Sequence, residues 1–123
     1  MHLQESGEMY LESIFVLSQK SLHVRAIDIC EYMGYSKPSV SRAVGLLKDG
    51  GYVSVDKNGY LTLTEVGQEV AEKIYKRHTQ ICEFLEMIGV THQTASEDAC
   101  KIEHVISDES LNAIMKHVSE HNK

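Results

Sequence analysis

The sequence has no apolar run long enough to cross a membrane and does not begin like a signal peptide. It has only three cysteines, Cys30, Cys82 and Cys100, and this odd, widely spaced set argues against a disulfide framework and for reduced thiols. Low-complexity segments and internal repeats are absent as well. These absences predict a soluble cytoplasmic protein, and 123 residues suffice for one ordinary domain or two very small ones.

The negative charge is distributed unevenly along the chain. The formal net charge is −6, a value that argues against a nucleic-acid binder if it is taken for the chain as a whole. Residues 1–62, however, carry six Lys and Arg against seven Asp and Glu, a net charge of −1. Residues 63–123 carry six against eleven, a net charge of −5, so we expect cations to bind in this second half.

Residues 100–104, Cys-Lys-Ile-Glu-His, place three possible metal ligands close together. We expect them near the start of a helix that runs from about Ser96 to Ser107. Residues three and four apart share a helix face, so Cys100, Glu103 and His104 are predicted to project to one side. A thiolate, a carboxylate and an imidazole suit Fe(II), Zn(II) or Co(II) better than Mg(II) or Ca(II). A half-buried cysteine beside a solvated Glu-His pair explains the pentad equally well.

A helix-turn-helix is predicted in the first half of the chain. Ala26–Met33 has helical apolar spacing and stops at Gly34, and the next helix begins with Ser36 as N-cap and Pro38 in its first turn. Small hydroxyls and two cations line the exposed face of this second helix, as in helices that enter the major groove of DNA. The predicted DNA contacts here are Lys37, Pro38, Ser39, Ser41 and Arg42.

A β-hairpin follows, which turns the helix-turn-helix into a winged helix. Tyr52–Asp56 alternates with period two, Asn58-Gly59 is a strong hairpin signal, and Tyr60–Leu63 forms the second strand. Lys57 at the hairpin tip is predicted to reach a phosphate. An ordinary solvated surface is the alternative for these polar residues, and the wing favours DNA binding.

The second half is predicted to be helical. A long helix begins at Thr62 or Thr64 and ends at Met87, and His78 and Cys82 lie four residues apart on its apolar face. That is metal-ligand spacing, although such residues are more often part of a core. After a connection over 90–95 and the helix that carries Cys100, a last helix follows Ser107. The apolar stripes are too many for so few residues to bury, which predicts a homodimer. The expected fold is mainly α with a small β wing, and the expected domains are 1–63 for DNA binding and 64–123 for metal binding and dimerisation.

Together these elements resemble the diphtheria-toxin-repressor family, which includes the iron-dependent and manganese-dependent transcriptional repressors of bacteria. The resemblance covers nearly the whole chain and implies the short form, without the SH3-like domain of longer members. The segments that carry it are Glu8–Glu12, Ser36–Ser41, Leu61–Thr64, Arg77-His78 and Asp98–Glu109.

The resemblance implies a primary regulatory metal site. In iron-type members a Met at the position of Met9 joins Cys, Glu and His at the positions of Cys100, Glu103 and His104. In manganese-type members the Met position is Asp, the Cys position is Glu, and a Glu at the position of Glu12 also ligates. This chain is iron-type at Met9 and Cys100 and yet carries Glu12. Without the resemblance, Met9 reads as a core residue and Glu12 as a solvated charge.

The resemblance also implies an ancillary site in iron-type members. It uses the position of His78, a Glu four residues later, and a His four residues before the primary Cys. This chain has Cys82 and Ser96 at the last two positions. The ancillary site is therefore altered or absent, with Glu83 and Glu97 as possible substitutes.

These observations predict a metal-activated, homodimeric transcriptional repressor that controls metal homeostasis at a palindromic operator. Fe(II) is the expected ion, because Met9 and Cys100 are soft ligands. Mn(II) is the alternative, and Zn(II) or Co(II) are expected to bind in vitro. A second hypothesis keeps the winged helix but senses redox state through the cysteines, or a small ligand. The His-Glu-x-x-His arrangement of zinc hydrolases is absent and no catalytic constellation is present, so we do not expect an enzyme.

Overall fold

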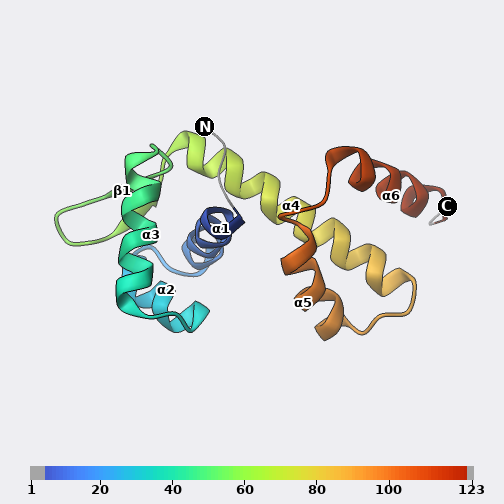
Figure 1. Cartoon of the computed structure of the whole chain (residues 1–123), viewed down its shortest axis with the longest axis horizontal. Helices are drawn as coiled ribbons and strands as arrows, with labels where there is room; N and C mark the ends of the chain where they lie inside the picture. The colour runs from blue at the N-terminus through green and yellow to red at the C-terminus, as the bar shows by residue number, and fades with distance from the viewer. Residues whose placement is uncertain (1–4, 122–123) are drawn as a thin grey trace. The chain divides into compact units, whose positions relative to one another are not determined.

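The computed structural model describes residues 5–121, which form six helices and two strands. In chain order these are α1 (Glu5–Lys20), α2 (Ala26–Met33), α3 (Lys37–Asp49), β1 (Val53–Val55), β2 (Leu61–Leu63), α4 (Glu65–Met87), α5 (His92–Ile102) and α6 (Asp108–His121). This order confirms the predicted fold of a winged helix followed by a helical region (Figure 1). The chain divides into two compact units, Met1–Glu72 and Lys73–Lys123, and the division lies within α4.

The helix-turn-helix of the first unit has the boundaries that its local sequence signals predict. Gly34 ends α2 with φ 73°, a left-handed conformation that glycine adopts without steric cost. Ser36 is the N-cap of α3, where its hydroxyl accepts a hydrogen bond from the Ser39 N–H, and Pro38 lies in the first turn. The turn between the helices therefore fixes where α3 begins.

A buried apolar core holds the first unit together. It includes residues from α1, α2, α3, both strands and the first turns of α4. Among its most deeply buried members are Leu11, Ile14, Val24, Ile29, Val40, Leu47 and Val53. Because each of these helices contributes a buried stripe, α3 is held firmly while its opposite face stays exposed.

The wing is an antiparallel ribbon of β1 and β2. Asp56 closes its loop, because its carboxylate accepts hydrogen bonds from the N–H groups of Asn58, at 2.8 Å, and Tyr60, at 3.0 Å. Gly59 has φ 82°, a left-handed conformation that glycine adopts without steric cost, and its N–H donates a hydrogen bond to the Asp56 carbonyl at 3.0 Å. Lys57 is exposed in this loop.

Thr64 determines where α4 begins. Its hydroxyl accepts a hydrogen bond from the Gly67 N–H, at 3.1 Å, and donates one to the Gly51 carbonyl, at 2.7 Å. Gly67 lies so close to Tyr52 that an added Cβ would be 1.9 Å from the Tyr52 carbonyl oxygen. Of the two residues predicted to start this helix, Thr64 is therefore the one that caps it.

The second unit consists of α5 and α6 around the later turns of α4 (Figure 1). Its core joins Ile81 and Cys82 of α4 to Ala95 and Ala99 of α5 and Leu111 of α6. None of the helices within residues 5–121 is long and apolar enough to cross a bilayer.

The helix that carries Cys100 differs from the prediction. It was expected over about 96–107 and lies at His92–Ile102, so Cys100 is in its last turn rather than near its start. Thr91 begins the helix, because its hydroxyl accepts a hydrogen bond from the Thr94 N–H. Much of the segment predicted as a connection is therefore helical.

Candidate metal centre and nucleic-acid interface

Three possible metal ligands of the second unit meet at His78. The imidazole Nδ1 of His78 lies 2.9 Å from Oε2 of Glu103 and 3.7 Å from Sγ of Cys100. One donor atom from each of the three residues lies within 4.8 Å of the other two. A nitrogen, an oxygen and a sulfur at this spacing are able to share one divalent transition metal ion.

The electrostatics of this group fit a cation. The hydrogen bonds of His78 with Cys100 and with Glu103 raise the pKa of His78 to about 10, well above its ordinary value. The Glu103 side chain is fully buried, and its Oε1 accepts no hydrogen bond of good geometry from the described residues, although Nε2 of His104 lies 3.3 Å away. A buried carboxylate is costly unless positive charge compensates it, and a metal ion would supply more of that charge than one imidazolium. The residues present therefore fit a bound metal.

Arg77 fixes the backbone around this group. Its guanidinium donates hydrogen bonds to the carbonyl oxygens of Glu103, at 2.9 Å, and Ile106, at 2.8 Å. It also forms an ion pair with Asp108 at 2.8 Å. Arg77 and His78 are neighbours on α4, so adjacent residues bind the backbone and the side chain of Glu103. The turn after α5 is thereby attached to α4.

His104 does not occupy the position that a continuous helix would give it. Helix α5 ends at Ile102, Glu103 is its C-cap, and the N–H of Val105 bonds to the Ile102 carbonyl in a tighter turn. Nε2 of His104 lies 3.3 Å from Oε1 of Glu103, in a buried position. The expectation of one helix that continues through Cys100, Glu103 and His104 is thus wrong, because Glu103 and His104 follow its last residue, and His78 is the residue that completes the described group around Cys100.

Met9 and Glu12, the remaining primary-site residues implied by the resemblance, lie on α1 in the first unit. Both side chains are half-buried. The hydroxyl of Ser13 donates a hydrogen bond to the Met9 carbonyl at 2.9 Å. Their role as ligands stays a prediction.

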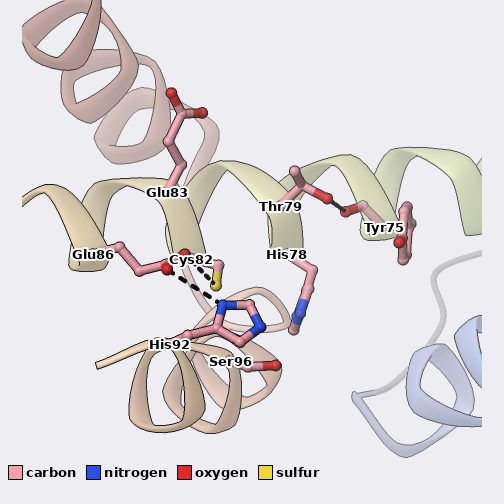
Figure 2. Close-up of a pocket in the computed structure, with 8 residues that line it drawn as sticks. All are labelled: Tyr75, His78, Thr79, Cys82, Glu83, Glu86, His92 and Ser96. Carbon is pink, nitrogen blue, oxygen red and sulfur yellow. Dashed lines mark hydrogen bonds and ion pairs between the residues drawn. The ribbon is translucent and has the colours of Figure 1, made fainter. Parts of the chain in front are cut away.

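A second group of donors, from α4 and the first residue of α5, lies in a pocket of about 670 Å³. Sγ of Cys82 donates a hydrogen bond to Oε2 of Glu86, at 3.4 Å, and Nδ1 of His92 lies 3.3 Å from Oε1 of Glu86 (Figure 2). Burial, followed by the hydrogen bond to Glu86, raises the pKa of the Cys82 thiol. His78 and Cys82, whose spacing suited a shared metal ion but also a core, thus belong to two different groups.

Sequence reasoning missed Glu86 and His92 as possible ligands. Glu86 lies four residues after Cys82, which is the same spacing that singled out His78 and Cys82. His92 offered no such signal, because it lies in the segment predicted as a connection. Of the substitutes considered, Glu83 lines the pocket but points away from Cys82 and His92 (Figure 2), and Glu97 is exposed beside Gln93.

The predicted DNA contacts of the first unit are all exposed. Five of them lie in the first turns of α3 and one lies in the wing loop: Lys37, Pro38, Ser39, Ser41, Arg42 and Lys57. At the N-terminus of α3 the Ser36 hydroxyl donates a hydrogen bond to the Ser39 hydroxyl, at 2.9 Å. Free N–H groups at a helix N-terminus and nearby cations are the means by which proteins hold phosphates.

A cluster beside the wing adds a cation that sequence reasoning did not single out. The guanidinium of Arg25 donates a hydrogen bond to the Tyr60 hydroxyl, at 3.0 Å, and lies 4.6 Å from the centroid of the Tyr60 ring. The ring of His23 stacks on the same tyrosine at 4.3 Å. These contacts hold the start of β2 against the segment before α2.

Comparisons with known proteins agree with this division of roles. The profile described as the N-terminal DNA binding domain of iron dependent repressors matches residues 2–61. The profile described as their metal binding and dimerisation domain matches residues 64–123.

Individual relatives extend over most of the chain. An uncharacterised HTH-type transcriptional regulator of Methanocaldococcus jannaschii is 35% identical over 111 residues, which cover 89% of each chain. The HTH-type transcriptional regulator MntR of Lysinibacillus sphaericus is 33% identical over 109 residues, covering 89% of this chain and 78% of that one. The structure of the manganese regulator SloR aligns with a TM-score of 0.81 and 31% identity. That alignment covers 97% of this chain and 55% of the SloR chain, so this chain spans about half of SloR.

Proposed function

We propose that this chain, which belongs to the iron-dependent repressor family, is a transcriptional repressor whose binding to DNA is activated by a divalent transition metal. The observation that carries the proposal is the group of His78, Cys100 and Glu103 within the region that matches a metal-binding and dimerisation domain. The same chain carries an exposed helix rich in hydroxyls and cations in the region that matches a DNA-binding domain.

The proposed roles at the metal site follow from ligand chemistry. His78 supplies an imidazole nitrogen, Cys100 a thiolate and Glu103 a buried carboxylate. A bound metal would supply positive charge to all three donors together and would take the place of the proton on His78. We propose His104, Met9 and Glu12 as the further ligands, on the resemblance to the family, with Fe(II) as the cognate ion and Mn(II) as the alternative.

We propose that metal binding affects DNA binding because the proposed ligands come from two regions of the chain. We assign residues 1–63 to DNA binding and 64–123 to metal binding and dimerisation. Ligands from both regions would restrict the positions that each DNA-binding region adopts, and so the spacing of two α3 helices in a homodimer. Half-sites of such dimers lie about one helical turn apart, so we propose a palindromic operator. Coupling energies of this kind are typically about 1–3 kcal/mol, or about 5-fold to 150-fold in affinity.

The second unit also has features of a dimer interface. Met87, Ile88 and Val105 are exposed apolar side chains in the region that matches a dimerisation domain. Burying them against a second copy would remove apolar surface from water. A repressor of this kind binds DNA and needs its cysteine thiols reduced. We propose on these two grounds that it is located in the cytoplasm.

The experiment that tests the proposal is fluorescence anisotropy of a labelled palindromic operator. Protein is titrated in reducing buffer with Fe(II), Mn(II), Zn(II) or Co(II), and metal stoichiometry is measured alongside. We expect metal to increase operator affinity at least about fivefold, and His78→Ala to abolish the increase while His117→Ala, an exposed matched control, retains it. Equal binding with and without every metal would overturn the proposal. Binding that depends on oxidant alone would favour the redox alternative.

A further inference from the structure

Cys82, Glu86 and His92 form a group of donors separate from His78, Cys100 and Glu103. Cys82 and Glu86 lie one turn apart on α4, and His92 is the first residue of α5. Gly89, with φ 105°, allows the chain to reverse between the two helices. The three side chains converge from both sides of this reversal (Figure 2).

Two distances between donors of this group match the ligand spacing of a tetrahedral metal ion. With Zn–S bonds of about 2.3 Å and Zn–N and Zn–O bonds of about 2.0–2.2 Å, adjacent ligands of a tetrahedral ion lie roughly 3.3–3.7 Å apart. Sγ of Cys82 lies 3.4 Å from one carboxylate oxygen of Glu86, and Nδ1 of His92 lies 3.3 Å from the other. One donor atom from each of the three residues lies within 4.8 Å of the other two, so small movements of the side chains would bring all three to one ion, with loss of the Cys82 thiol proton.

We propose that Cys82, Glu86 and His92 bind a second divalent transition metal ion, independent of the site around His78. A soft thiolate, an imidazole and one carboxylate are the donor set that Zn(II), Co(II) and Fe(II) accept and that Mg(II) and Ca(II) do not favour. The pocket is open at His92, whose side chain is 79% exposed, so water completes the coordination and the ion exchanges with solution.

The packing of α5 on α4 explains why the ligands are these and not the ancillary set expected from the resemblance. His78 contacts Cys100 in the last turn of α5, and Glu86 contacts His92 in its first turn, so the two helices run antiparallel. His78 is thereby engaged with Cys100 and Glu103. Ser96 lines the same pocket, where the expected ligand was a histidine, and His92 lies one helical turn before it. The second site is thus displaced by about one turn along both helices.

The decisive experiment uses Co(II) absorption in a chain that lacks the other thiols. In the double variant Cys30→Ser, Cys100→Ser, the thiolate of Cys82 is the one remaining source of a sulfur-to-cobalt charge-transfer band. We expect this band together with intense visible bands of tetrahedral Co(II), and we expect Cys82→Ser in that background to remove the charge-transfer band. Cys100→Ser removes the thiolate of the proposed regulatory site, so any Co(II) that still binds there contributes no thiolate charge-transfer band, and affinities in this background are read from that band.

Two further variants identify the remaining ligands. His92→Gln and Glu86→Gln should each lower Co(II) affinity in this background at least about tenfold, because loss of even an outer partner of a metal ligand costs 10- to 100-fold. The matched controls Glu83→Gln and His117→Gln should retain the affinity of the background, since Glu83 points away from the group and His117 lies on α6. Folding of every variant is checked by circular dichroism.

A measurement on the otherwise wild-type chain covers the case in which the double variant does not fold. Bound metal should then fall by one ion per chain in His92→Gln and stay unchanged in His117→Gln. The absence of a charge-transfer band in the folded double variant, or affinities that His92→Gln and Glu86→Gln leave unchanged, would overturn the second site. Cys82 would then be a buried thiol that donates a hydrogen bond to Glu86 and binds no metal.

Discussion

The guanidinium of Arg77 donates a hydrogen bond to the backbone carbonyl of Glu103 at 2.9 Å, so the residue beside one proposed ligand holds the backbone of another. A second donor of the same side chain reaches the carbonyl of Ile106 at 2.8 Å. The hydrogen bonds of Arg77 thus fix the backbone of Glu103 where its carboxylate contacts His78. Positioning of this kind determines how much of the metal's binding energy is lost in ordering its ligands.

Removing the Arg77 side chain should therefore weaken metal binding although it removes no proposed ligand. We expect Arg77→Ala to lower metal affinity by about 10- to 100-fold, as for other partners that orient ligands. It should also lower the free energy of unfolding by about 1.5–3 kcal/mol, the range for hydrogen bonds to a charged group. Isothermal titration calorimetry and urea unfolding measure the two effects. Lys76→Ala, at an exposed neighbour on α4, is the control, and wild-type metal affinity in Arg77→Ala would show that the turn keeps its position unaided.

The N-terminal turns of α3 should determine affinity for DNA. Replacing Lys37 or Arg42 by Ala removes an exposed cation, so we expect weaker operator binding. The dependence of affinity on salt should become shallower, by about one unit of slope for each phosphate that the variant no longer neutralises. Metal affinity should not change. Anisotropy at several salt concentrations measures the effect, with Lys116→Ala on α6 as control, and unchanged DNA affinity in both variants would remove this helix from the interface.

Local sequence signals sufficed to predict the helix-turn-helix and the wing of the first unit. Gly34, Ser36 and Pro38 act within a few residues of themselves, by allowing a left-handed turn, capping a helix and fitting its first turn. The Asn58-Gly59 pair likewise predicted the wing, although Asp56 closes that loop with its own carboxylate. A turn or a helix start of this kind can be predicted from the sequence, because it depends on residues within a few positions of itself.

The grouping of ligands in the second unit could not be predicted in the same way. His78 is separated from Cys100 and Glu103 by more than twenty residues, and the antiparallel packing of α5 on α4 brings them together. The start of α5 was decisive, because Thr91 begins the helix earlier than the predicted start at about Ser96 and so places His92 beside Glu86. Periodicity predicts which residues share one face of a helix, but it does not predict which residues of another helix pack against that face.

Metal affinity should fall as the pH is lowered. The hydrogen bonds with Cys100 and Glu103 raise the pKa of His78 to about 10, so at neutral pH a proton occupies the nitrogen that a metal needs. Binding should release about one to two protons, from His78 and from the Cys100 thiol. Calorimetry in two buffers of different ionisation enthalpy counts them, and His78→Gln should release about one fewer. Equal proton release in this variant and the wild type would show that His78 is not a ligand.

The raised pKa of His78 should make the metal-free fold more stable at low pH, whereas metal affinity should be greater at high pH. Because the pKa of His78 is raised above its ordinary value of 6.5, the charged imidazole stabilises the fold fully below about pH 6.5. This contribution is lost as the pH rises through about 10. Added metal should therefore raise the melting temperature more at pH 8 than at pH 6, since metal affinity is greater where fewer protons compete. Thermal unfolding at the two pH values, with and without Zn(II), measures the difference.

The choice of metal should depend on Met9 and Cys100. A thioether and a thiolate are soft donors that disfavour Mn(II), the weakest binder of the Irving–Williams order, relative to Fe(II), Co(II) and Zn(II). Glu12 acts in the other direction if it ligates, because it adds a hard oxygen. We expect wild-type protein to bind its operator at lower concentrations of Fe(II) than of Mn(II), and the double change Met9→Asp, Cys100→Glu to shift the response toward Mn(II). Anaerobic anisotropy titrations with the two metals measure both responses, and the single change Glu12→Gln tests whether that oxygen contributes. A wild-type response to Mn(II) at concentrations no higher than for Fe(II), or an unchanged preference in the double variant, would show that the soft donors do not decide the metal.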